Sequence, residues 1–174
     1  GFLDVESVST SSTSSAATTT ADIRYAETLL IDAGWEQQED RSWIKDIDDV
    51  STKLSITITT EDSEVFVKTA ELIKTAWESL GVEVSVAIFA KSDLAQVIIR
   101  PRDYQALLFG TEVGRALDLY PFWHSSQKDD PGLNVALYTN ITADDLLETA
   151  RTTRDEVERA LSIQGFESEI LSET

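Results

Sequence analysis

Apolar residues recur along this chain with two different periods, and the change from one period to the other predicts its elements. Every second residue is apolar in 54–58 and again in 82–88, the pattern of a half-buried strand. Over 63–80 the apolar residues recur at three and four positions, which predicts a helix that ends at Gly81. Strand, helix and strand with short joints predict a right-handed βαβ unit with parallel strands. We expect Trp77, on the inner face of the helix, to lie in the core.

The remaining pattern predicts further elements around this unit. Asp22 and Gly34 bracket a helix over 23–33 as N-cap and left-handed C-cap. The other expected elements are a short strand at 42–45, a short helix at 94–99, a central strand at 104–109, and helices at 143–153 and 154–164. Thr142 to Asp145 approximates a capping box. The sequence therefore predicts an α/β fold with a mixed sheet and flanking helices.

The two last helices carry apolar residues that should face inward. In the first these are Leu146, Leu147 and Ala150, and in the second they are Val157, Ala160, Leu161 and Ile163. Before the first helix of the chain, Ser7 to Thr20 consist almost entirely of Ser, Thr and Ala. Such a tract cannot offset the entropy of ordering, so we expect residues 1–20 to be a flexible segment and 21–174 to form the folded unit.

The segment after the strand at 104–109 is the most informative for function. Gly110 ends the strand, and Asp118, Tyr120, Phe122, Trp123 and His124 then fall within seven residues. A turn at Asp130-Pro131-Gly132 follows. Aromatic and acidic side chains just past the carboxyl end of a strand are typical of a cleft for a small molecule or peptide.

Three motifs in this chain resemble the second lobe of the family 5 extracellular solute-binding proteins, the receptors of peptide and nickel ABC importers. The first is the Leu-Leu-x-x-Ala-Gly-Trp helix end at 29–35, and the second is the Trp-x-x-Leu-Gly-Val-x-Val crossover at 77–84. The third is the strand and loop from Tyr104 through Gly110, Asp118, the Phe122-Trp123 pair, Asn134, Tyr138 and Asn140 to Leu146 and Ala150. The resemblance covers about residues 21 to 160 and implies a periplasmic-binding-protein-like lobe.

This resemblance implies a receptor that closes by a hinge motion around a peptide or other small solute and presents it to an ABC permease. The chain is then a fragment whose missing first lobe supplies half of the contacts. The location is extracytoplasmic, in the periplasm or at the outer face of the membrane, anchored through missing sequence. No catalytic residue, cofactor or metal is expected. The ligand-binding residues it implies are Thr111, Glu112, Arg115, Asp118, Tyr120 and Trp123.

Two of those positions depart from the family pattern. Arg115 stands where the peptide receptors have an acid that grips the ligand's ammonium group, and Thr111 stands where a Trp usually follows the Gly. Arg115 suits a carboxylate or another anionic group instead. Asp118 matches the aspartate of the family's Asp-Pro pair, with Leu119 in place of the proline. Its alternative role is to organise the loop by accepting backbone N–H groups.

Charge and composition exclude several function classes. The chain has 14 basic and 32 acidic residues, a net charge of −18 that repels nucleic-acid phosphates. It has no Cys and one His, which excludes thiolate chemistry and disfavours a zinc site. The acidic run Asp46–Asp49 lacks the Gly and terminal Glu of an EF-hand loop and reads as a solvated turn.

Two other readings of the function stay open at this stage. An interaction or regulatory domain can reuse the same fold, because a fold does not fix a function. A hydrolase is less favoured, since a triad would have to use His124 and the chain has no Gly-x-Ser-x-Gly elbow. We expect His124 to be a packed residue of the aromatic loop.

Overall fold

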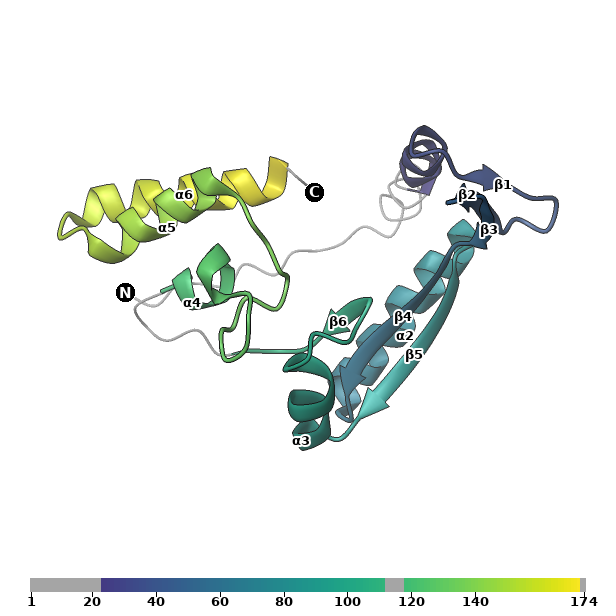
Figure 1. Ribbon diagram of the computed structural model, residues 1–174, viewed down its shortest axis with the longest axis horizontal. Coiled ribbons are helices and arrows are strands. Elements are labelled where there is room, and N and C mark those ends of the chain that lie inside the picture. Colours follow the sequence, from purple (N-terminus) through teal and green to yellow (C-terminus); the bar gives the residue numbers. More distant parts are fainter. Residues whose placement is uncertain (1–22, 112–117, 173–174) are drawn as a thin grey trace, which may run out of the picture.

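The computed structural model of the protein describes residues 23–111 and 118–172. The Ser/Thr-rich segment at 1–20 and the predicted ligand residues Glu112 and Arg115 lie outside these ranges. Figure 1 shows two parts, a sheet with one long helix against it and a separate pair of helices near the C-terminus. None of the helices in the described ranges has the length and apolar character that crossing a membrane requires.

The predicted βαβ unit is confirmed. Strand β4 (Ser55–Glu61), helix α2 (Glu64–Leu80) and strand β5 (Glu83–Phe89) follow one another, and β4 pairs in parallel with β5 from Ser55↔Glu83 to Glu61↔Phe89. Strand β6 (Ala106–Leu108) pairs in parallel with the other side of β4. The order is therefore β5-β4-β6. The expectation that the strand at 104–109 is central was wrong, because β4 carries the buried run that needs a neighbour on both sides.

The core of this part lies between the sheet and α2. Its buried members are Ile58, Ala70, Val82 and Val84. Trp77 is only half-buried and packs against this cluster, so the predicted inner face of the helix is confirmed in its register. Only one face of α2 contacts the sheet, and Leu72 on another face is 72% exposed.

An antiparallel sheet precedes the βαβ unit. It consists of β1 (Glu36–Gln37), β2 (Trp43–Ile47) and β3 (Val50–Lys53), in that order. Strands of the two directions thus form separate sheets within the described residues. Trp43, which the pattern did not single out, is 1% exposed, and its Nε1 donates to the Leu80 carbonyl over 2.7 Å. This sheet therefore packs against the end of α2. The helical residues 23–32 lie just before it.

After β5 the chain forms a short helical segment and then returns to the sheet. Helix α3 (Lys91–Asp93) continues into η1 (Leu94–Ile99), a π-helical turn in which Leu94 and Ile98 are buried. This confirms the predicted short helix at 94–99. Beyond β6 come two single turns, α4 (Tyr120–Trp123) and the 3₁₀ turn η2 (Ser125–Gln127).

The last part is a hairpin of helices α5 (Ile141–Thr152) and α6 (Glu156–Ser172). Asn140, and not Thr142, is the N-cap of α5, since its side chain accepts the N–H of Ala143 over 3.1 Å. The apolar stripe predicted for α6 was only partly right, because Ile163 is half-buried. Val157 and Leu161 are 68% and 62% exposed, whereas Ser162 and Phe166 are buried. Because α6 packs mainly on α5, with Phe166 also touching Trp123 of α4, only a narrow stripe of it is covered.

Candidate functional site

The predicted site begins where β6 ends. Thr60, which is completely buried in β4, donates from its hydroxyl to the Leu108 carbonyl over 2.7 Å and holds β6 in place. Thr111 follows three residues later and is exposed. An exposed threonine hydroxyl just past the carboxyl end of a parallel strand is accessible to a bound molecule.

Asp118 is half-exposed and organises the chain that leads into α4. Its carboxylate accepts the N–H of Tyr120 over 3.2 Å and faces Arg151 of α5, with Oδ2 3.5 Å from Nε. Both interactions fit the loop-organising role that the sequence left open. The carboxylate is still 38% exposed, so part of it faces solvent.

Tyr120 lies in a stack of three side chains. Its ring is 4.1 Å from the His124 ring at an angle of 20°, and the Arg151 guanidinium lies 4.5 Å from its centre. Beside Tyr120 and Arg151 are a cavity of about 180 Å³ and a more open hollow of about 450 Å³. Tyr120 therefore separates two concave regions, and the cation–π contact fixes Arg151 over it.

Trp123 points away from these hollows and into the helical hairpin. It packs edge to face against Tyr138 and Phe166, at ring distances of 6.0 and 5.9 Å. The buried residues of this second core are Ala143, Leu147 and Phe166. The structure thus brings Asp118 and Tyr120 together through Arg151, and it places Trp123 in the core that supports them.

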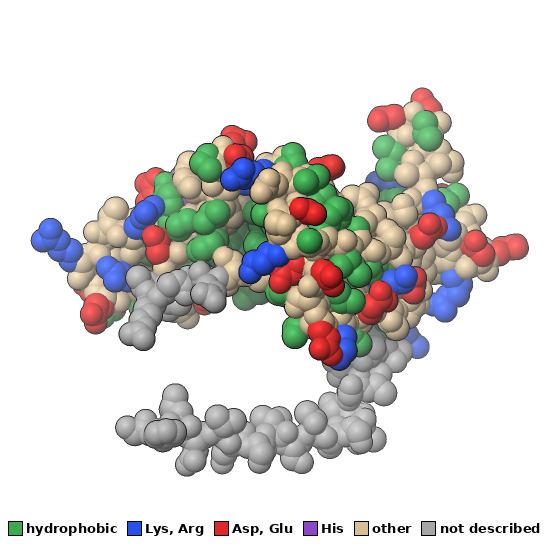
Figure 2. Space-filling model, turned by 90° about the horizontal axis from the view of Figure 1, so that it is seen from below, with side chains coloured by type: hydrophobic (Ala, Val, Ile, Leu, Met, Phe, Trp, Pro, Cys, Tyr) green, Lys and Arg blue, Asp and Glu red, His purple; other side chains and the backbone are tan. Residues whose placement is uncertain are grey.

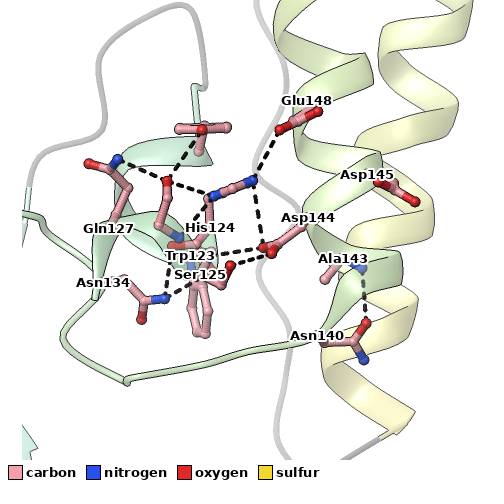
Figure 3. A network of polar contacts seen from close by, with 12 residues as sticks. Trp123, His124, Ser125, Gln127, Asn134, Asn140, Ala143, Asp144, Asp145 and Glu148 are labelled. Carbon is pink, nitrogen blue, oxygen red and sulfur yellow. Dashed lines mark hydrogen bonds and ion pairs between the residues drawn. The ribbon is translucent and has the colours of Figure 1, made fainter. Parts of the chain in front are cut away.

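His124 is buried and caps the turn η2. Its Nδ1 accepts the N–H of Ser126 over 3.1 Å, and its Nε2 lies 3.4 Å from Glu148 and 3.9 Å from Asp144 (Figure 3). Ser125 donates from its N–H and hydroxyl to Asp144, over 2.9 and 2.5 Å. These contacts join the loop to α5. Because Nδ1 already accepts a backbone N–H, the arrangement is that of a packed loop residue, as expected from the sequence.

Asn134 is the residue that closes the loop. It is completely buried, and its amide nitrogen lies 3.0, 3.1 and 2.9 Å from the carbonyl oxygens of Trp123, His124 and Tyr138. Its amide oxygen accepts the N–H of Tyr138 over 3.2 Å. In the sequence Asn134 stood out only as part of a motif. No periodic signal marks a residue whose partners are the backbone groups of three residues on two separate segments, Trp123, His124 and Tyr138.

A third cavity, of about 310 Å³, lies between η1, the end of β6 and the turn at 130–135. Its walls include Ile99, Phe109, Phe122, Leu133 and Val135, and Thr111 also lines it. The sequence does not predict this cavity, because its walls come from segments up to forty residues apart that show no shared pattern. Of the cavity walls, the sequence indicated only the turn at Asp130-Pro131-Gly132.

The walls of this cavity are held by hydrogen bonds from two side chains, Arg102 and Tyr104. Arg102 donates to the carbonyls of Ile99, Lys128 and Gly132 over 2.5, 3.1 and 2.7 Å. Tyr104 donates from its hydroxyl to the Val135 carbonyl. Burial raises the pKa of the Tyr104 hydroxyl, and the charge of Arg102 acts in the opposite direction. The hydroxyl therefore stays a proton donor.

Within the described ranges, no three His, Cys, Asp or Glu side chains group in a way that would hold a metal ion. The acidic run at 46–49 forms the end of β2 and the turn to β3, where Asp48 and Asp49 take positive φ values of 51° and 62°. This agrees with the solvated turn that the sequence suggested.

The fold of the described residues is similar to that of solute-binding proteins of ABC importers, the class that the sequence motifs resemble. No protein-family model and no curated protein sequence matches the chain. The likeness therefore comes from three-dimensional structure. The neighbours are substrate-binding proteins and not enzymes.

Three solved structures illustrate the likeness. The oligopeptide-binding protein AppA from Bacillus subtilis, in complex with a nonapeptide, has a TM-score of 0.76 and 27% identity, over 84% of this chain and 29% of that one. NikZ from Campylobacter jejuni, in complex with Ni(L-His), has a TM-score of 0.71 and 22% identity, over 83% and 29%. An oligopeptide-binding protein from Thermus thermophilus, complexed with a pentapeptide, has a TM-score of 0.67 and 16% identity, over 83% and 26%. The chain thus spans less than a third of each.

Proposed function

We propose that this chain is the carboxy-terminal lobe of a solute-binding protein that delivers a small solute, most favourably an oligopeptide, to an ABC permease. The observation that carries the proposal is the match to AppA, over 84% of this chain, with a TM-score of 0.76 and 27% identity. The polar and aromatic loop after β6 supports it, because ligands of α/β folds bind beyond the carboxyl ends of strands. The site binds and releases its ligand without covalent chemistry.

In this proposal the loop after β6 is the ligand face of the lobe. Thr111, Glu112, Arg115, Asp118 and Tyr120 offer hydrogen bonds and charge, while Trp123 supports the loop from the helical core. A first lobe supplies the opposite wall, and the ligand stabilises the closed arrangement of the two lobes. The net charge of −18 favours the approach of cationic solutes, although salt weakens this steering.

The same proposal sets the location of the protein. A receptor that hands its solute to a membrane permease works outside the cytoplasm, in the periplasm or at the outer face of the cell membrane. An anchor or leader would then lie in sequence beyond this chain.

The test is calorimetric titration of the two-lobed protein that carries this chain with pools of short peptides. We expect Asp118→Ala and Arg115→Ala each to weaken binding by about 10-fold or more, the usual effect of losing one charged contact. Stability should change by less than about 1 kcal/mol for Asp118→Ala, because its pair with Arg151 is solvent-exposed. Asp129→Ala, an exposed acid near the same loop, is the matched control and should leave affinity unchanged.

Two outcomes would contradict the proposal in different ways. Unchanged affinity in both variants, with a bound peptide in hand, would remove this loop from the site and leave the fold-level likeness standing. A two-lobed protein that binds no solute and does not close would favour the interaction domain.

A further inference from the structure

The cavity of about 310 Å³ beyond β6 is the least polar concave region near the predicted ligand loop. Its walls are side chains of Ile99, Phe109, Phe122, Pro131, Leu133 and Val135. Thr111, the first residue of the predicted ligand face in the described chain, also lines it. Figure 2 shows hydrophobic side chains gathered around the middle of the face it draws, with acidic side chains among and around them. The cavity therefore adjoins the proposed ligand face and offers it an apolar compartment.

The cavity is held open by contacts that need no ligand. Arg102 bonds to one carbonyl of η1 and two carbonyls of the turn at 128–132, so it spans the cavity's two sides. Tyr104 fixes Val135 through its carbonyl. A guest that enters a compartment already formed does not have to order these walls, so most of its apolar burial counts toward affinity.

The size and lining of the cavity favour one kind of bound group, a large apolar side chain. An engineered apolar cavity of about 150 Å³ admits a benzene molecule, so about 310 Å³ accommodates a side chain from leucine up to tryptophan. The charged residues of the lining are Arg100, Arg102 and Asp130. The Arg102 guanidinium is taken up by its bonds to three backbone carbonyls. Arg100 and Asp130 are 67% and 52% exposed and pair with each other over 3.9 Å. Their charges face solvent, where they suit the polar backbone of a peptide rather than its side chain.

We propose that this cavity is a specificity pocket that receives one bulky apolar side chain of the bound solute. The substrate class is then peptides, or amino-acid derivatives, that contain a large aliphatic or aromatic residue. This inference rests on the proposed function, since it names the ligand of that same site.

The experiment compares two sets of alanine peptides on the two-lobed protein, one of them carrying a single phenylalanine. We expect the phenylalanine peptides to bind about 10- to 100-fold more tightly, the fold-change for burying one large apolar side chain. In Leu133→Trp the larger side chain fills the cavity from its wall, so the phenylalanine side chain loses its contacts there. The phenylalanine peptides should then bind at most about threefold more tightly than the alanine peptides. The affinity for the alanine peptides should stay the same. Val97→Trp, at an exposed position of η1 outside the described lining, is the matched control and should keep the preference.

A second readout covers the case in which Leu133→Trp fails to fold. In the unmodified chain, N-acetyl-phenylalaninamide should shift the methyl NMR signals of Ile99, Leu133 and Val135 and leave Leu161 of α6 unchanged. Equal binding of both peptide sets, or methyl shifts confined to other residues, would overturn the pocket while peptide binding stands. Failure to bind any peptide would overturn the pocket together with the proposed function.

Discussion

Asn134 lies completely buried in the loop before α5, and its amide group bonds to four backbone groups of Trp123, His124 and Tyr138. A buried amide with partners on both ends is the residue-scale device that shapes an irregular loop, because each unpaired backbone group there would cost free energy. Arg102 and Thr60 act in the same way elsewhere. At this scale the shape of the candidate site depends more on hydrogen bonds from side chains to backbone carbonyls than on apolar contacts between side chains.

Trp43 and Trp77 differ in how deeply their side chains are buried. Trp43 is 1% exposed and donates to Leu80, whereas Trp77 is half-buried at the edge of its cluster. We expect Trp43→Ala to lower the free energy of unfolding by about 3–5 kcal/mol, and Trp77→Ala by about 1–3 kcal/mol, since less of that ring leaves the core. Urea denaturation of both variants measures the difference. Equal losses would mean that the antiparallel sheet does not pack on α2 as described.

At the scale of elements, the tight joint between α2 and β5 determines how the sheets meet. Gly81 has a φ of 95°, and a Cβ there would lie 2.0 Å from the Arg41 carbonyl oxygen. The joint therefore needs a glycine for two reasons: the left-handed backbone and the close approach of the loop before β2.

Gly34 provides a matched control for this joint. Its φ is 83°, but the nearest atom to an added Cβ would be Lys45 Cε at 3.7 Å. We expect Gly34→Ala to cost only the left-handed strain, about 1–2 kcal/mol, and Gly81→Ala to cost at least about 2 kcal/mol more because the backbone must move. Thermal and urea unfolding of the two variants test this. A Gly81→Ala protein as stable as Gly34→Ala would show that the two chain segments do not touch.

At the scale of the whole molecule, the sheet part and the helical hairpin have separate cores. They are joined through the 102–135 region, where Arg102 and Tyr104 bond to the loop before α5. A cavity lies at this junction. The relative position of the two parts therefore rests on polar contacts more than on a shared apolar interface.

Because Arg102 bonds across this junction, its substitution tests whether the polar contacts there hold the two parts together. Arg102→Lys keeps the charge but cannot reach three carbonyls with a planar fork. We expect hydrogen exchange to quicken by about 10-fold or more at 128–135, which corresponds to roughly 1.4 kcal/mol of local stability, while α2 and β4 keep their protection. Arg100→Lys, at a 67% exposed side chain, is the control and should change neither region. Uniform acceleration over the whole chain would show that the two parts unfold as one unit.

Several elements followed directly from the sequence. The βαβ unit, the short helix at 94–99 and the first helix of the hairpin, although not its N-cap, were predicted because such signals depend on local geometry alone. The inward face of α6 was only partly predicted, since Val157 and Leu161 have the right spacing but α5 covers another stripe. Of the site, Asp118 and Tyr120 were found as polar and aromatic residues after a strand. The walls of the apolar cavity were not, because they meet only through tertiary contacts.

The sequence by itself determined the class of fold, the parallel crossover and the loop that carries the candidate ligand residues. Period and turn chemistry act over a few residues, so one chain is enough to read them. The tertiary structure alone decided that β4 is central, that Trp43 is the deeply buried tryptophan, and that Asn134 and Arg102 hold the loop. It also decided that an apolar compartment adjoins Thr111. These features arise where segments distant in sequence satisfy each other's buried polar groups, and no local pattern encodes which segments will meet.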